Sequence, residues 1–231
     1  MFRLMCKRED KVKRIKGAIF DLDGTILDST WVWKRVDEEF LGKYGFEVPE
    51  DYSDAIKAMG FEQVAEYTIT RFRLPLSTSE VMAEWNQMAA RAYSEQVKIR
   101  HGTKELLLWL KEQGIPAGVA TSNTALLFEP CLKNNGIYDL FHSFTEANEV
   151  DRGKEFPDIY IKEAGKLGCE PSSCIVFEDI IPALKGAGNG GFVTIGVKES
   201  AWGYEEEEFG RYCDHILYEI SDAISLLKQM D

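Results

Sequence analysis

The stretch Gly17–Thr25, GAIFDLDGT, constrains this chain more than any other, because a short apolar segment leads directly into two carboxylates in alternate positions. If residues 17–21 form a strand, Asp21 and Asp23 lie at its carboxyl end and project toward the same side. Two like charges that close repel each other unless a cation or a proton lies between them. The pair therefore indicates a hard metal ion such as Mg²⁺, which prefers oxygen ligands. Gly24 allows the sharp turn that must follow.

The motif Asp21–Thr25 resembles the nucleophile motif of the haloacid dehalogenase (HAD) superfamily of phosphohydrolases. The resemblance implies three further motifs downstream in a fixed order, and because all three are present it spans the chain from about Lys16 to Asp231. Within this superfamily the chain is similar to the phosphatases and to the beta-phosphoglucomutase-like and phosphoglycolate phosphatase-like proteins, which carry a helical cap. The fold that this implies is α/β, with a Rossmann-like parallel sheet as the core and an inserted helical cap domain.

The second motif is an apolar strand pattern, Ile115–Ala120, that runs into Thr121, Ser122 and Asn123 ahead of a helical pattern. Hydroxyl and backbone N–H groups at such a turn are good phosphate ligands, because a helix N-terminus favours anions. Alone, the pattern fits an ordinary helix N-cap better. Its place in the series of motifs favours substrate binding by these three residues.

The third motif is Asp151–Tyr160, where the resemblance implies a lysine within a Lys-Pro-x-Pro-like signature. Lys154 is that lysine, Glu155 replaces the first proline, and Pro157 is retained. A lysine beside the acids would offset the charge of a bound phosphate and keep the nucleophilic carboxylate ionised. Arg152 is a rival that falls outside the pattern, so Lys154 is the predicted substrate-binding cation.

The fourth motif is the apolar strand pattern Cys174–Asp179, which ends in two acids. Asp179 matches the metal-binding aspartate that the resemblance implies, with Glu178 as a direct or water-mediated companion. Ile180 stands where the family usually has a serine, which removes one possible hydrogen bond to the metal ligand. The segment Ile181–Gly188 keeps a helix start and the small residues that allow close packing.

The resemblance implies a phosphatase mechanism. Asp21 would attack phosphorus to form an aspartyl-phosphate, and Asp23 would serve first as acid and then as base. The expected cofactor is Mg²⁺, held by Asp21, the main-chain carbonyl of Asp23, Asp179 and the companion Glu178. Thr121, Ser122, Asn123 and Lys154 would hold the phosphoryl oxygens. The predicted partner is a small phosphorylated metabolite, and Asp28 is expected only to cap the following helix.

Four alternatives share these motifs. A phosphosugar mutase would use the same core but return the phosphoryl group to a substrate hydroxyl. A dehalogenase has no need for an acid/base at Asp23, and a phosphonate hydrolase would need a cap lysine, for which Lys57 is the nominee. A non-catalytic binding module has no reason to keep every chemical role. The resembling mutases place a histidine in the first cap helix where this chain has Trp33, and basic residues near Met59 and Gln63, which favours the phosphatase.

The positions of the motifs, together with the resemblance, imply three parts. Residues 1–15 form a flexible basic lead-in, 16–28 and 101–231 the HAD-like α/β core, and 29–100 the helical cap. Apolar residues in 29–100 recur at helical spacing without a strand pattern, and Ser77–Glu80 is typical of a helix start. From residue 101 onward strands and helices alternate, which favours a parallel sheet whose ligands bind at the carboxyl ends of its strands.

Composition narrows the function classes. The net charge of −12 argues against nucleic acid as the main partner. No stretch approaches the ~20 apolar residues of a membrane span. We expect a cytoplasmic protein with reduced thiols, because no Cys-x-x-Cys pair occurs among Cys6, Cys131, Cys169, Cys174 and Cys213. We also expect a monomer or weak dimer.

Overall fold

The computed structural model describes residues 15–56 and 59–230, so Cys6, Lys57 and all but the last residue of the predicted lead-in lie outside it. The chain divides into two compact units, Met1–Ser29 with Val97–Asp231, and Thr30–Gln96. Each unit is described by itself below. Within the described ranges, no helix is long and apolar enough to cross a membrane.

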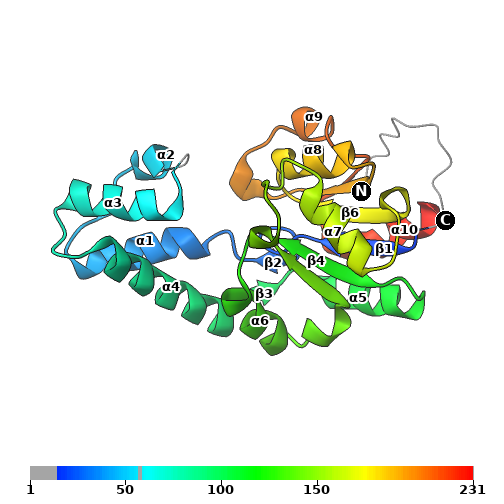
Figure 1. The fold of residues 1–231 in the computed structure, drawn as a ribbon, viewed down its shortest axis with the longest axis horizontal. Coiled ribbons are helices and arrows are strands. Elements are labelled where there is room, and N and C mark those ends of the chain that lie inside the picture. Colours follow the sequence, from blue (N-terminus) through cyan, green and yellow to red (C-terminus); the bar gives the residue numbers. More distant parts are fainter. Residues whose placement is uncertain (1–14, 57–58, 231) are drawn as a thin grey trace. The chain divides into compact units, whose positions relative to one another are not determined.

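The first unit is built on a six-stranded sheet in the order β5-β4-β1-β6-β7-β8, in which every neighbouring pair is parallel (Figure 1). Its strands are β1 (Gly17–Phe20), β4 (Ala117–Thr121), β5 (Ser143–Glu146), β6 (Cys174–Glu178), β7 (Val193–Val197) and β8 (His215–Leu217). The apolar segment that opens the first motif forms β1, and all four of its residues are buried between β4 and β6. A fully buried apolar strand is what a parallel sheet covered on both faces requires.

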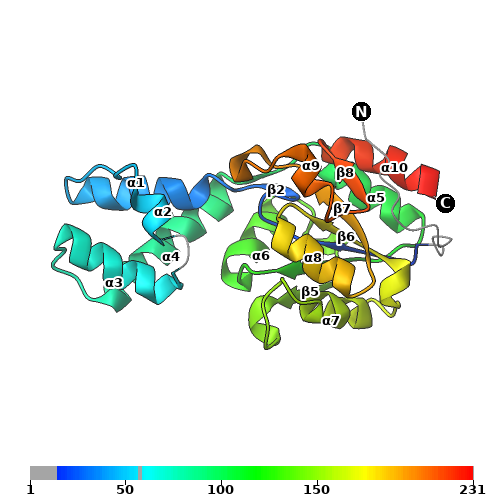
Figure 2. The same cartoon turned by 90° about the horizontal axis from the view of Figure 1, so that it is seen from above.

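Helices cover both faces of this sheet. The connecting helices are α5 (Thr103–Glu112), α6 (Ala125–Asn134), α7 (Asp158–Lys166), α8 (Ile181–Asn189), α9 (Glu206–Phe209) and α10 (Ala223–Met230). Figure 2 shows α5 and α10 together on one face and α7 and α8 on the other. Ile19 of β1, Val176 of β6 and Tyr160 of α7 belong to one apolar cluster. The predicted α/β core with a parallel sheet is confirmed.

The second unit contains the helices α1 (Val32–Lys43), α2 (Tyr52–Ile56), α3 (Phe61–Phe72) and α4 (Thr78–Glu95). Both α1 and α3 pack against α4, and Phe40 of α1 meets Trp85 of α4 edge to face, with ring centroids 5.5 Å apart. The predicted helix start is present, because Ser77 and Glu80 form a reciprocal capping box at α4. Buried apolar residues on each helix therefore supply this unit with a core of its own.

The prediction of a strandless cap over 29–100 is wrong at its carboxyl end. Lys98–Ile99 forms β3, which pairs antiparallel with β2 (Leu27–Asp28), and both strands belong to the first unit. Two residues of alternating character give too weak a pattern to be recognised without the partner strand. Asp28 is also misassigned, since it lies in β2 and the N-cap of α1 is Trp31. After the first motif the chain forms only the two-residue strand β2, which β3 pairs with, before α1 begins.

The expectation of reduced thiols is wrong for one pair, because Cys169 and Cys174 form a disulfide with Cα atoms 6.7 Å apart. The bridge spans the turn that leads into β6 and lies over Gly17 of β1. A Cβ atom at Gly17 would stand 2.6 Å from the Sγ of Cys169, so the bridge needs the glycine. Sequence spacing alone could not show that this turn folds back on itself.

Candidate active site

Three adjacent strands end at the same edge of the sheet, and their carboxyl ends carry the predicted site residues. Asp21 follows β1, Thr121 ends β4, and Glu178 and Asp179 end and follow β6. Since β4 and β6 both pair with β1, parallel pairing alone brings these side chains together. The backbone N–H of Asp21 still donates to the carbonyl of Phe177 at 3.0 Å, so the sheet ladder extends to the site.

Asp21, Glu178 and Asp179 form a buried acidic cluster, in which each offers a carboxylate oxygen within 4.8 Å of the others. The hydroxyl of Thr25 lies 3.1 Å from Asp21 Oδ2 and 3.2 Å from Asp179 Oδ1, so these two oxygens converge on one point. Buried like charges this close repel each other unless a cation or a proton lies between them. An all-oxygen donor set of carboxylates fits Mg²⁺.

Lys154 supplies one positive charge to the cluster. Its Nζ donates to Asp21 Oδ1 and, at 2.6 Å, to Glu178 Oε1. The loop that carries Lys154 can approach because a helical glycine lies beneath it: a Cβ atom at Gly186 of α8 would stand 2.0 Å from the Lys154 carbonyl oxygen. The rival cation Arg152 instead forms an exposed bidentate pair with Asp158. Three carboxylates against one ammonium leave two negative charges if all are ionised.

The electrostatics of the cluster reflect this excess. Burial, with the nearby Asp21 charge, raises the pKa of Glu178 to about 7 even though Lys154 acts in the opposite direction. Burial and the charges of Asp21 and Glu178 raise the pKa of Asp179 well above its usual range. Burial opposes the charge on Lys154, but the two carboxylates outweigh it and raise the pKa of that ammonium. The cluster without a metal is therefore short of positive charge.

The carboxyl group of Asp23 points away from the acidic cluster. Its Oδ1 accepts a hydrogen bond from Ser29 Oγ at 2.6 Å, and its Oδ2 accepts one from Asn123 Nδ2 at 2.9 Å. The carboxyl group is thus held toward the carboxyl end of β4, while the main chain stays beside Asp21. Gly24, at φ +80°, provides the turn that follows Asp23.

The three residues of the predicted phosphate-binding turn after β4 differ in their exposure and in their hydrogen bonds. Thr121 is buried, and its Oγ1 accepts from the backbone N–H of Asn123 at 3.0 Å. Ser122 is exposed, and Asn123 Oδ1 accepts from the backbone N–H of Thr124 at 2.8 Å, just before α6 begins. The turn is therefore ordered by its own side chains, with Asn123 also linking it to Asp23.

Sequence reasoning gave no role to several residues of this site. Thr25 and Ser29 orient the carboxylates of the first motif, and Tyr160 donates to Glu178 Oε1 at 2.8 Å. Trp202 Nε1 donates to Asp179 Oδ2. The missed signal for Trp202 was its place shortly after β7, another strand that ends at the same edge of the sheet.

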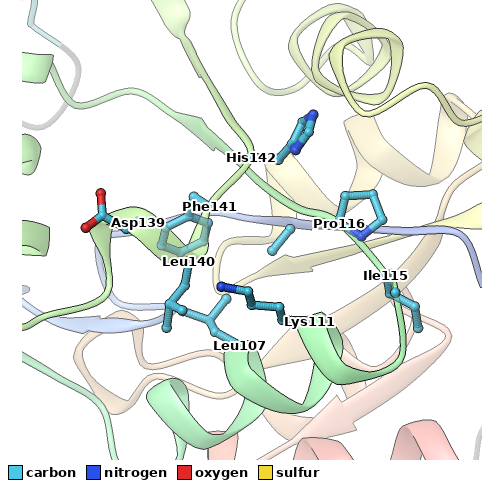
Figure 3. Close-up of a pocket in the computed structure, with 10 residues that line it drawn as sticks. Leu107, Lys111, Ile115, Pro116, Asp139, Leu140, Phe141 and His142 are labelled. Atoms are coloured by element: carbon cyan, nitrogen blue, oxygen red, sulfur yellow. The ribbon is translucent and has the colours of Figure 1, made fainter.

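A separate cavity of about 290 Å³ lies at the opposite edge, where β4 and β5 begin (Figure 3). It is lined by Leu107, Lys111, Pro116, Phe141 and His142, among others. None of these residues belongs to the acidic cluster. The candidate active site therefore rests on the carboxyl edge of the sheet and not on this cavity.

Comparison with known proteins agrees with this geometry. The sequence model of the haloacid dehalogenase-like hydrolases matches residues 18–197, which include every motif described above. The chain belongs to this family. The identification made from the four motifs is confirmed.

Relatives of this HAD hydrolase include phosphatases. A probable pseudouridine-5'-phosphatase of Drosophila melanogaster is 27% identical over 196 residues, covering 81% of this chain and 84% of the relative. Hexitol phosphatase B of Escherichia coli (strain K12) is 25% identical over 175 residues, covering 74% and 78%. The crystal structure of beta-phosphoglucomutase (pgmB) from Clostridium difficile superposes with a TM-score of 0.72 at 18% identity over 94% and 96% of the two chains, which shows the fold alone. Family and relatives support phosphatase activity.

Proposed function

We propose that this HAD phosphatase hydrolyses a small phosphorylated metabolite with Mg²⁺, through a phosphoryl group carried transiently on Asp21. The acidic cluster is the observation that carries the proposal: Asp21 shares it with Glu178 and Asp179, with Lys154 beside them. The phosphatase relatives named above act, by their names, on phosphate esters of small molecules. A similar class of substrate is proposed here.

In the first step a carboxylate oxygen of Asp21 attacks phosphorus, and the bond to the alcohol oxygen breaks. Asp23, held by Ser29 and Asn123, gives its proton to the departing alkoxide. In the second step Asp23 takes a proton from water, the water oxygen bonds to phosphorus, and Asp21 leaves as a carboxylate with release of inorganic phosphate.

Lys154 and the turn Thr121–Asn123 bind the phosphoryl oxygens in this proposal. The ammonium of Lys154 offsets negative charge on the transferred group, and the backbone N–H groups near the start of α6 add dipoles of the same sense. Asp21, Asp179, the main-chain carbonyl of Asp23 and Glu178 would hold the metal ion, which would supply Lewis-acid charge to the transfer. Catalysis is then mainly positioning and electrostatics.

The first step of the test is to assay phosphate release from a panel of phosphorylated metabolites with Mg²⁺. The reaction with an active substrate is then quenched rapidly in acid, to trap any phosphorylated protein. We expect mass spectrometry to find one phosphoryl group on the peptide that contains Asp21. Asp21→Asn should carry none. Turnover without any labelled protein, at quench times shorter than one turnover, would contradict the covalent step.

A phosphosugar mutase is the second candidate, because a beta-phosphoglucomutase shares the fold. A mutase must keep water away from the phosphorylated aspartate, and this chain has Trp33 where the resembling mutases place a histidine. We therefore expect inorganic phosphate from monophosphates with no bisphosphate activator. Phosphorus NMR measures both products, and isomerisation of a sugar phosphate faster than phosphate release would establish the mutase instead.

A further inference from the structure

The indole of Trp202 bonds to the acidic cluster although the residue is partly exposed to solvent. The side chain is 42% exposed, yet its N–H donates inward to Asp179 Oδ2. An indole N–H can only donate, so it fixes that oxygen as an acceptor. With Thr25 at Oδ1, both oxygens of Asp179 have a partner. Ile180, at the serine position of the family signature, offers no hydroxyl for this purpose.

The turn that carries Trp202 is fixed at both ends. Glu199 Oε1 accepts from the backbone N–H of Ala201 at 2.9 Å and so caps the short helical turn Ser200–Trp202. Gly203 follows at φ +63°, a conformation that suits glycine. Lys198 Nζ donates to the carbonyl of Tyr204 across the turn. The exposed tryptophan therefore stands on a constrained backbone.

Arg100 connects this turn to the loop that follows the nucleophile. Its Nη1 donates to the carbonyl of Gly24 at 2.6 Å and to Glu199 Oε2 at 3.1 Å, and Nη2 lies 3.4 Å from the carbonyl of Lys198. The Arg100 and Glu199 side chains are only 16% and 15% exposed. A partly desolvated pair with additional backbone hydrogen bonds holds its geometry better than an exposed pair. The loop after the nucleophile and the turn that carries Trp202 are thus linked through one guanidinium.

We propose that Trp202 is a positioning residue for the metal ligand Asp179, in place of the hydroxyl that Ile180 lacks. This inference rests on the proposed function, because it assumes that Asp179 binds Mg²⁺. A carboxylate fixed at both oxygens cannot rotate, so less ordering is required when a cation binds. Outer hydrogen bonds of this kind typically change metal affinity about 10–100-fold.

The first experiment is calorimetric titration of the full-length protein with Mg²⁺ alone, without substrate. Trp202→Phe keeps an aromatic ring and removes the N–H, and we expect its Kd for Mg²⁺ to rise at least about 10-fold. Trp109→Phe, the same change on α5 of the same unit, is the matched control and should bind as the wild type does. An unchanged Kd in Trp202→Phe overturns the proposal.

Tryptophan emission gives an independent readout. Because the indole N–H bonds directly to Asp179, we expect Mg²⁺ to change the emission of the wild type and of Trp109→Phe, and to leave Trp202→Phe almost unchanged. An equal change in Trp202→Phe and the wild type would mean that the signal comes from another tryptophan, and would contradict the assigned contact.

A double-mutant cycle separates positioning from general destabilisation. Glu199→Ala loosens the turn but leaves the indole, so it should raise the Kd for Mg²⁺ less than Trp202→Phe does. If Glu199 acts through Trp202, the double variant binds no worse than Trp202→Phe alone. If the two substitutions instead reduced Mg²⁺ affinity additively, Glu199 would not act through Trp202. Thermal unfolding of each variant provides the check that it is folded.

Asp179→Asn distinguishes failure of this inference from failure of the proposed function. We expect it to lose Mg²⁺ binding altogether. If it does so while Trp202→Phe binds normally, only the role of Trp202 is wrong. If Asp179→Asn binds Mg²⁺ as the wild type does, the proposed metal site itself is wrong.

Discussion

Two buried carboxylate sites of the same α/β unit differ in the partners of their carboxylate oxygens. Glu163, fully buried on α7, accepts hydrogen bonds from the hydroxyls of Ser143 and Thr145, the latter at 2.5 Å. The cluster of Asp21, Glu178 and Asp179 instead places three carboxylates around one lysine.

The two sites also differ in the space around them. Glu163 fills the room above Gly118 of β4, where a Cβ atom would stand 2.0 Å from its Oε1. A single carboxylate with two neutral donors in a filled space satisfies a structural role. A cluster with more acid than base, at the carboxyl edge of the sheet, has an excess of negative charge that a metal ion would offset. The comparison teaches that several acids sharing too few cations, and not burial of one hydrogen-bonded acid, distinguish a candidate site from a packing solution.

The largest expected effect is on the nucleophile. Asp21→Asn is nearly isosteric but scarcely nucleophilic, so phosphatase turnover should fall on the order of 10⁴-fold or more. Asp23→Asn should lose about 10²-fold, the usual contribution of a positioned acid/base. Initial rates of phosphate release with Mg²⁺ measure both. Near-normal turnover in Asp21→Asn would remove the cluster from the chemistry and erase its contrast with Glu163.

Metal removal should have the next largest effect. EDTA should stop turnover, Mg²⁺ should restore it, and Ca²⁺ should support it poorly, because Ca²⁺ favours more ligands and longer bonds. Rates in buffers with each metal, together with Mg²⁺ binding by calorimetry, provide the measurement. Full activity in metal-free buffer would show that the excess negative charge of the acidic cluster does not serve to bind a catalytic metal ion.

Stability against pH should sharpen the comparison further. The pKa of Glu178 is raised from an ordinary 4.5 to about 7, so the metal-free folded state keeps its proton after the unfolded chain has lost its own. Between about pH 4.5 and 7, unfolding free energy should therefore fall with rising pH, by up to about 3 kcal/mol relative to Glu178→Gln. Urea unfolding of both proteins in EDTA measures the difference. If the free energy of unfolding of the wild type instead rose with pH relative to that of Glu178→Gln, the raised pKa would be contradicted.

The smallest effect is expected at the structural site. Glu163→Gln keeps the volume and turns one acceptor into a donor that a hydroxyl can accept, so it should cost about 1–2 kcal/mol of stability. Turnover and the Kd for Mg²⁺ should equal those of the wild type. Denaturant midpoints and the same phosphate assay test this, and loss of Mg²⁺ affinity would mean that the two carboxylate sites are coupled.

The sequence allowed most of the fold to be predicted, because strand and helix periodicity is a local property. The buried strand before Asp21 and the helix that begins after Ser77 are where the patterns put them. The two-residue strand β3 and the Cys169–Cys174 bridge were not foreseen. Both depend on a partner segment that local spacing does not identify.

For the candidate site, the amino-acid sequence determined which chemical groups are available: two carboxylates after β1, a hydroxyl turn after β4, a lysine ahead of α7 and two acids ending β6. The alternation of strands and helices predicted that the groups after β1, β4 and β6 lie at one edge, since parallel strands end together. Only the tertiary structure decided how each group is used. Asp23 turns to Ser29 and Asn123, and Trp202 reaches Asp179. Such contacts depend on side-chain directions across segments far apart in the chain, which no local pattern encodes.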